Sequence, residues 1–171
     1  MHPISAELAH RPSGVSGIPG VPPSPNVPGY YLRPRANGFV AHVCTSGAAL
    51  RSVRRLVPMV LRGHGIVAED VDNAQLVVSE LVGNSVRACG DHVPVVVEVY
   101  AASYGVAVNV HDPDPDLSAL PRRGTVPLDS AVAESGRGLG LLDLLAPGWQ
   151  VRRWSIGKQV RCRVPARREP S

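Results

Sequence analysis

Residues 76–90 read LVVSELVGNSVRACG, and they have the apolar content of a helix that packs in a protein core. The apolar residues recur at the three- and four-residue spacing of an amphipathic helix. On a helical wheel, one broad face suits packing on a sheet and comprises Ala74, Val77, Val78, Leu81, Val82, Ser85, Val86 and Ala88. A narrow opposite stripe is polar and comprises Asn73, Glu80, Asn84 and Arg87. The stripe therefore faces something other than the core.

This polar stripe has two interpretations. A solvated helix face would need only a weak contact between Glu80 and Arg87. A binding site is the alternative, because a carboxylate and an amide oxygen four residues apart can activate a hydroxyl and hold a hard cation such as Mg²⁺. Gly83 beside the stripe costs about 1 kcal/mol relative to alanine, which favours the second interpretation without settling it.

Composition narrows the function classes. The chain has 171 residues, which suits one domain of ordinary size. Its net charge is +4, and Lys158 is the only lysine among 18 lysines and arginines. The arginines are scattered along the sequence and no aromatic residues alternate with them, so a solvated basic surface is favoured over nucleic-acid binding. We therefore expect no direct nucleic-acid partner.

The cysteines and the apolar runs indicate a cellular compartment. Cys44, Cys89 and Cys162 form no C-x-x-C pair and have no histidine at a zinc-ligand spacing. They are expected to be buried or incidental thiols in a reducing compartment. The N-terminus lacks an apolar core of the signal-peptide type, and no apolar run reaches the roughly 18 residues of a membrane span. We expect a soluble cytoplasmic protein without a membrane partner.

Proline-rich composition separates the first part of the chain from the rest. Residues 1–36 are rich in proline, glycine and serine and lack alternation, so they are predicted to form a disordered or extended tail. Residues 37–165 are the predicted domain, and residues 166–171 a C-terminal tail.

Within the domain, the predicted order is strand, helix, helix, strand, strand, loop, helix, strand, strand. The corresponding ranges are 38–45, 46–65, 70–89, 93–102, 105–112, 113–137, 138–146, 149–156 and 159–164. Ser46 is the expected N-cap of the first helix, Pro58 is expected to kink it, and Gly90 to end the second. The last two strands are expected to turn at Gly157 and Lys158. Helices on one face of a mixed, mostly antiparallel sheet form an α+β two-layer sandwich.

A second motif lies where a predicted strand ends. In VNVHDPDP, residues 108–115, Asp112 closes the strand beside a long loop. An ordinary Asp-Pro turn explains this arrangement. A carboxylate in this position also suits recognition of an exocyclic amine.

A third motif precedes the last predicted helix. In ESGRGLGLLDLLA, residues 134–146, Gly136, Gly138 and Gly140 alternate with other residues. Backbone N–H groups without side chains at a positive helix end can hold phosphate groups, and Arg137 adds a positive charge. The pattern is neither a dinucleotide fingerprint nor a Walker A loop.

Taken in this order, the three motifs resemble the GHKL (Bergerat-fold) ATP-binding superfamily. Within it, the chain looks like the single-domain anti-sigma factor serine/threonine kinases and their histidine-kinase-like ATPase relatives. SELVGNSV is similar to the N box, VHDPDP occupies the place of the first glycine box, ESGRGLGLLDLLAPGWQV resembles the second, and GKQV resembles the closing strand. The resemblance covers residues 38–164 and implies the α+β sandwich already reached from the order of elements.

The resemblance also implies roles for individual residues. Glu80 matches the general base, Asn84 the ligand of a Mg²⁺ ion that bridges the phosphates, and Asp112 the acceptor of the adenine amino group. The remaining ATP-binding residues that it implies are Arg87, Gly136, Arg137, Gly138, Leu139, Gly140 and Lys158. Lys158 is alternatively a solvated hairpin tip. Residues 113–135 would form the lid over ATP.

Two functions remain open at this point. The resemblance implies a kinase that uses ATP and Mg²⁺, binds a sigma factor, phosphorylates an anti-sigma factor antagonist and forms a homodimer. However, Asp112 is followed by Pro113, Asp114, Pro115 and Asp116, where the first glycine box usually reads D-x-G-x-G. Extra carboxylates facing a triphosphate would weaken its binding. The alternative is therefore a non-catalytic regulator that binds nucleotide or a protein partner.

Overall fold

The computed structural model describes residues 29–114 and 134–167, with the backbone alone described at 134–139. The elements, in chain order, are β1 (Tyr30–Arg35), β2 (Gly38–Cys44), α1 (Gly47–Gly63), α2 (Ala68–Cys89), β3 (Pro94–Ala102), β4 (Gly105–Asp112), α3 (Glu134–Leu145), β5 (Gln150–Trp154) and β6 (Gly157–Pro165). Among these described helices, none is long and apolar enough to cross a membrane.

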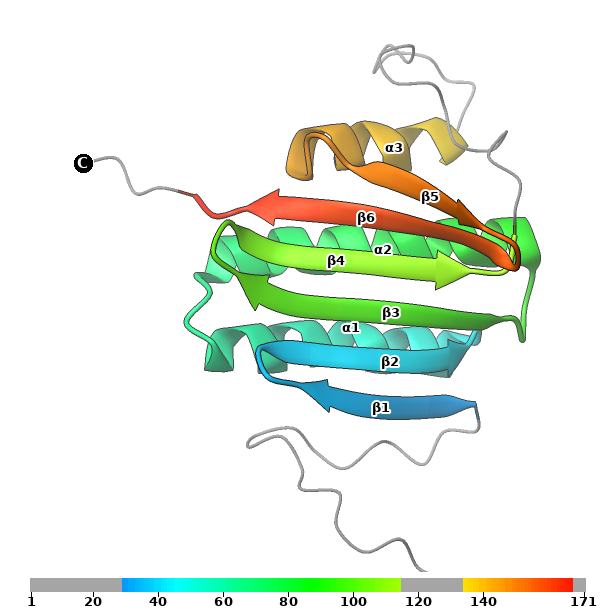
Figure 1. The fold of residues 1–171 in the computed structure, drawn as a ribbon, viewed down its shortest axis with the longest axis horizontal. Coiled ribbons are helices and arrows are strands. Elements are labelled where there is room, and N and C mark those ends of the chain that lie inside the picture. Colours follow the sequence, from blue (N-terminus) through cyan, green and yellow to red (C-terminus); the bar gives the residue numbers. More distant parts are fainter. Residues whose placement is uncertain (1–28, 115–133, 168–171) are drawn as a thin grey trace, which may run out of the picture.

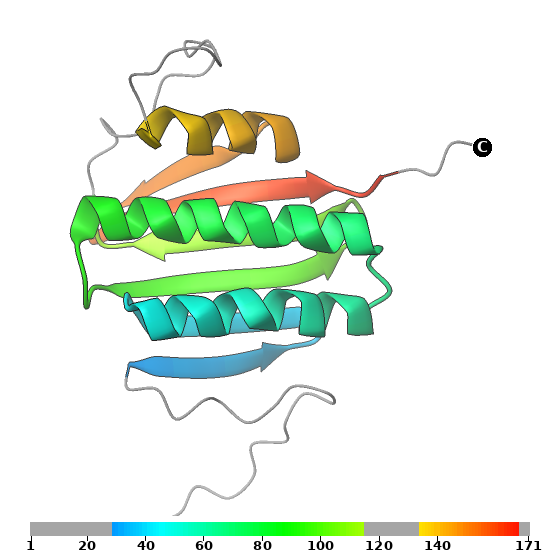
Figure 2. The ribbon, with the colours of Figure 1, turned by 180° about the vertical axis from the view of Figure 1, so that it is seen from behind.

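The strands form one six-stranded sheet in the order β1-β2-β3-β4-β6-β5. All pairings among the described strands are antiparallel, so the sheet is antiparallel where we had expected a mixed one. The three helices cover one face of the sheet, and no described helix covers the other (Figures 1 and 2). The predicted α+β two-layer sandwich is confirmed.

The core lies between the sheet and the helices, where valines predominate. Val77, Val78, Leu81 and Val82 of α2 are buried as the wheel predicts, whereas Ala88 is exposed. The predicted N-cap of α1 and the predicted end of α2 are also confirmed. The Ser46 hydroxyl accepts from the Ala49 N–H at 3.2 Å, and Gly90 ends α2 with a φ of 85°, which favours glycine. Helix α1 includes Pro58.

The predicted tail was wrong at its end, because residues 30–35 form the edge strand β1. The many prolines of residues 1–36 had argued against a strand in this segment. Pro34 is nevertheless compatible with β1, since an edge strand leaves one side of its backbone without a hydrogen-bonded neighbour. Residues 1–28 lie outside the described part of the chain.

Two boundaries near the C-terminal end also differ from prediction. Helix α3 begins at Glu134 rather than at residue 138, so the stretch predicted as the end of a loop is helical. The β5–β6 turn consists of residues 155–156, and Gly157 and Lys158 belong to β6. The register pairs Asp112 with Lys158, which brings two distant parts of the sequence together.

Candidate functional site

Four element ends meet at one edge of the molecule. The end of α2, the end of β4, the beginning of β6 and the beginning of α3 lie at the right side in Figure 1 and at the left side in Figure 2. The three sequence motifs occupy these ends, so the fold gathers the predicted site residues at this edge.

Asp112 is held by three groups of the chain itself. It is 4% exposed, and its Oδ2 accepts a hydrogen bond of 2.8 Å from the Ser85 hydroxyl. Its Oδ1 accepts from the Asp114 N–H at 3.1 Å and lies 3.1 Å from the ammonium of Lys158. The hydroxyl on α2 thereby connects the N-box helix to the carboxylate that ends β4.

Lys158 is buried between two carboxylates, so the alternative interpretation of Lys158 as a solvated hairpin tip was wrong. Its Nζ lies 3.1 Å from Asp112 and 2.8 Å from the Asp114 carboxylate, and it donates to the Asp114 carbonyl at 3.1 Å. Burial lowers the pKa of the ammonium, but hydrogen bonds to Asp114 and Asp112 outweigh burial and raise the pKa overall. Lys158 is therefore a fixed cation near neutral pH.

Glycine at position 157 makes this approach possible. Gly157 has a φ of 140°, and a Cβ atom placed there would lie 2.0 Å from the Asp112 carbonyl oxygen. A side chain would push β6 away from the end of β4. The glycine thus brings the next residue, Lys158, against Asp112.

We call Ser85, Asp112, Asp114 and Lys158 the lysine cluster. The Cys89 thiol lies beside it: ligand atoms of Cys89, Asp112 and Asp114 are all within 4.8 Å of one another. Since the Lys158 ammonium already contacts both carboxylates, the positive charge that a metal would bring is supplied by the chain. Burial, together with the charges of Asp112 and Asp114, raises the pKa of Cys89, so it is a neutral thiol at pH 7.

The polar stripe of α2 is organised differently. Arg87 donates a hydrogen bond to Oδ1 of Asn84, and its Nη2 lies 4.0 Å from a Glu80 oxygen. The Glu80 and Arg87 side chains are 32% and 52% exposed. The Nδ2 atom of Asn84 is buried without a hydrogen-bond partner among the described residues. Glu80, Asn84 and Arg87 of the stripe therefore form a connected polar group with one unmet donor.

The glycines of the third motif lie inside α3 rather than directly before it. In an α-helix only the first N–H groups lack an internal partner, so Gly136 in the first turn can offer one to a phosphate. Gly138 and Gly140 lie further along, where N–H groups bond within the helix. A Cβ at Gly140 would meet no atom within 4 Å. Most of the predicted lid, residues 115–133, lies outside the described part of the chain.

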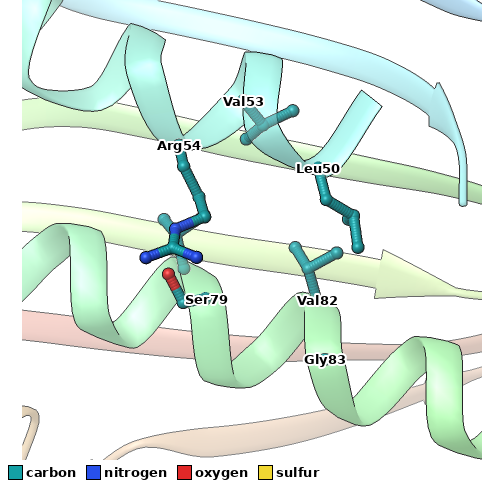
Figure 3. Close-up of a pocket in the computed structure, with 7 residues that line it drawn as sticks. Leu50, Val53, Arg54, Ser79, Val82 and Gly83 are labelled. Carbon is teal, nitrogen blue, oxygen red and sulfur yellow. The ribbon is translucent and has the colours of Figure 1, made fainter. Parts of the chain in front are cut away.

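A separate hollow lies on another side of α2. Figure 3 shows Leu50 of α1 extending toward Val82 of α2, with Arg54 reaching toward Ser79. The cavity measures about 100 Å³ and Gly83 also lines it, but the lysine cluster does not. Gly83 thus borders a small apolar hollow between the two helices.

A comparison with known protein families identifies the type of domain that contains these motifs. Residues 45–164 match the histidine kinase-like ATPase domain. The chain belongs to this family. Family membership supports ATP binding and agrees with the sandwich described above. A search of curated proteins gives no match.

Sequence reasoning missed two members of the lysine cluster in this histidine kinase-like domain. Ser85 was placed on the core face of α2, but its contact with Asp112 was not foreseen. Asp114 was regarded as an unfavourable charge, whereas Lys158 neutralises it in part. The sequence feature that could have indicated the pairing with Lys158 is the D-x-D sequence at a strand end, in a chain with a single lysine.

Proposed function

We propose that this protein is an ATP- and Mg²⁺-dependent serine/threonine kinase. It would sequester a sigma factor and phosphorylate an anti-sigma factor antagonist, as the resemblance of its motifs implies. The observation that carries the proposal is the meeting of the α2, β4 and α3 motifs at one edge of an ATP-binding histidine kinase-like domain. The identity of the protein partners rests on the resemblance alone.

Asp112 would recognise the adenine amino group. A carboxylate oxygen can accept more than one hydrogen bond, so the Ser85 contact leaves capacity at Oδ2. Ser85 and Lys158 hold the carboxylate in place before the base arrives. Such preorganisation reduces the entropy lost on binding.

The altered first glycine box is compatible with a nearby triphosphate. Asp114 adds a carboxylate, but its 2.8 Å contact with Lys158 offsets that charge. Arg87 and the first turn of α3 supply positive potential on the phosphate side, and Arg137 belongs to that turn. These groups would orient the triphosphate for transfer.

The donor set at Asn84 fits Mg²⁺. This ion binds one or two protein oxygens and takes its other ligands from phosphates and water. Asn84 Oδ1 is such an oxygen, and the Arg87 side chain that occupies it is half exposed and can turn toward the phosphates. When bound, the ion would neutralise phosphate charge.

Glu80 would act as the general base. Its carboxylate would take the proton of a serine hydroxyl on the antagonist, and the serine oxygen would attack the γ-phosphorus of ATP. The bond to the bridging oxygen then breaks and ADP leaves. Glu80 is partly exposed, so a partner hydroxyl can reach it.

A specific observation favours a second candidate, a non-catalytic regulator. Arg87 contacts both Asn84 and Glu80, the two residues that catalysis would need free. If Arg87 kept these contacts after ATP binding, the protein would bind nucleotide without transferring phosphate. Binding and turnover must therefore be measured separately.

Calorimetry with ATP, with and without Mg²⁺, is the first test. The wild-type protein is expected to bind in the micromolar range, about −8 kcal/mol. Asp112→Ala should abolish binding, and Asn84→Ala should remove its dependence on Mg²⁺. Asn73→Ala is the matched control, since Asn73 lies on the same helix away from the site edge. An absence of binding by folded wild-type protein would refute the proposal.

Glu80→Gln separates the two candidates. A kinase variant should retain ATP affinity but lose at least about 100-fold of the phosphoryl-transfer rate to a purified antagonist. Wild-type protein that binds ATP yet transfers no phosphate would establish the non-catalytic regulator instead.

A further inference from the structure

The sheet face away from the helices is strongly basic. In β2, the buried residues Phe39, Ala41 and Val43 point toward the helices, so the alternate positions point away. Extending this alternation through the strand register places these arginines on the same side, which we call the open face: Arg33, Arg35, Arg152, Arg161 and Arg163. Figure 1 looks onto this face, which no described helix covers.

The open face carries little compensating negative charge. Glu98 is the one acidic side chain that the described strands place there. Its oxygens already bond to Arg35 at 3.4 Å and to the Asn109 amide at 2.9 Å. The other acidic strand residue, Asp112, faces α2 through Ser85. Arginines that are scattered in the sequence are thus collected on one surface by the fold.

The arginines form two groups separated across the sheet. Arg33 and Arg35 lie on the edge strand β1, while Arg161 and Arg163 lie on β6 and Arg152 beside them on β5. Arg33 and Arg161 belong to one cross-strand row. Four strand spacings separate them, which is about 19 Å. An extended peptide of about six residues spans this distance.

Tyrosine rings hold two of these arginines. The Arg35 guanidinium lies 4.6 Å from the centre of the Tyr100 ring, and that of Arg163 lies 5.3 Å from the centre of the Tyr104 ring. A stacked guanidinium loses mobility but keeps its edge N–H groups available to a carboxylate. The same stacking covers one face of each of these rings.

We infer that the open face binds an acidic segment of a partner protein. The segment would carry carboxylates at both ends of at least six extended residues and bridge the β1 and β6 arginine groups. Carboxylates match the forked geometry of guanidinium groups. Neither ATP nor the lysine cluster takes part in this contact, so it extends beyond the proposed kinase reaction.

Fluorescence anisotropy with labelled deca-glutamate tests the inference. The wild-type protein is expected to bind this peptide, with affinity that falls as salt rises. Reversing two charges by Arg161→Glu and Arg163→Glu should weaken binding at least about tenfold. Tetra-glutamate, at most about 14 Å long, cannot reach both groups and should bind more weakly than deca-glutamate.

The matched control is the pair Arg51→Glu and Arg55→Glu on α1, which changes the net charge equally on the helical side. Control binding should stay within about twofold of wild type. If both pairs lose affinity equally, the attraction is one of net charge and the inference is wrong. It is also overturned if the peptide does not bind, or if a ten-nucleotide single-stranded thymidine oligomer binds more tightly.

Two measurements keep the outcomes separate. Thermal unfolding of the Arg161/Arg163 variant checks its fold, and Arg161→Gln with Arg163→Gln replaces it if the double glutamate is unstable. ATP affinity of the same variant should equal that of wild type. Failure of peptide binding with normal ATP binding would refute this inference alone, whereas failure of ATP binding in wild type would refute the proposed function alone.

Discussion

The same stretch of α2 contributes to two polar groups with different properties. The lysine cluster is largely buried, and its ammonium lies 3.1 Å from the Asp112 carboxylate and 2.8 Å from that of Asp114. The polar stripe, formed here by Glu80, Asn84 and Arg87, is partly exposed and has a 4.0 Å ion pair. Ser85 belongs to the first group and its neighbour Asn84 to the second. One residue step along a helix turns the side chain by about 100°, which separates the two environments.

The difference lies in the energy needed to rearrange each group. A buried charge that loses its partner keeps a large desolvation penalty, so the lysine cluster has one favourable arrangement. An exposed ion pair contributes less than about 1 kcal/mol, so Arg87 can leave Glu80 and Asn84 at small cost. The lysine cluster is suited to holding a fixed recognition group, whereas the polar stripe is suited to changing partners when ligand binds.

The largest effect is expected for Lys158→Met, which would leave two carboxylates without their cation. We expect a loss of about 3 kcal/mol of unfolding free energy, seen as a decrease in melting temperature of roughly 10 °C. Because the pKa of Lys158 is raised, its contribution is fully present below about pH 10.4, the ordinary lysine value. It is lost only as pH rises through the raised, folded-state pKa. Melting curves between pH 6 and 9 should therefore show a constant difference from wild type.

Arg153→Met is the control for this prediction, because Arg153 is exposed on β5 directly opposite Lys158 in the register. Its melting temperature should change by less than about 2 °C. Equal effects of the two substitutions would mean that the buried pairing does not distinguish Lys158.

A smaller effect is expected for Ser85→Ala, which removes the hydroxyl that donates to Asp112. The loss of stability should be about 1 kcal/mol, since Lys158 and the Asp114 N–H still satisfy the carboxylate. ATP affinity should fall several-fold because Asp112 is oriented less firmly. Chemical denaturation measures the first effect and calorimetry the second. Unchanged values for both would remove Ser85 from the lysine cluster.

The smallest effect on stability is expected for Arg87→Ala, within about 0.5 kcal/mol of wild type. Affinity for Mg²⁺-ATP should nevertheless decrease, because the proposal gives Arg87 a role at the phosphates. Titration with ATP and then with adenosine distinguishes the outcomes, since adenosine binding should not change. A variant that binds Mg²⁺-ATP more tightly than wild type would make Arg87 an inhibitory occupant of Asn84.

Much of the fold could be predicted from local pattern. The helical spacing in residues 76–90, the Ser46 cap and the Gly90 stop are encoded by nearby residues, and the structure contains each of them. β1 was not predicted, because its short strand-like stretch adjoins the proline-rich residues before it and its stability comes from pairing with β2. Glycines at alternate positions similarly concealed the first turn of α3.

The candidate site likewise has features that local sequence encodes and features that depend on the tertiary structure. The sequence alone determined the residue types and the order of the three motifs, and hence the resemblance to ATP-binding proteins, since spacing along a chain fixes which face of a helix a side chain occupies. Only the tertiary structure decided that Lys158 is buried between Asp112 and Asp114, and that the scattered arginines share the open face. These contacts depend on strand register between segments more than 40 residues apart, and register is set by the packing of the whole sheet.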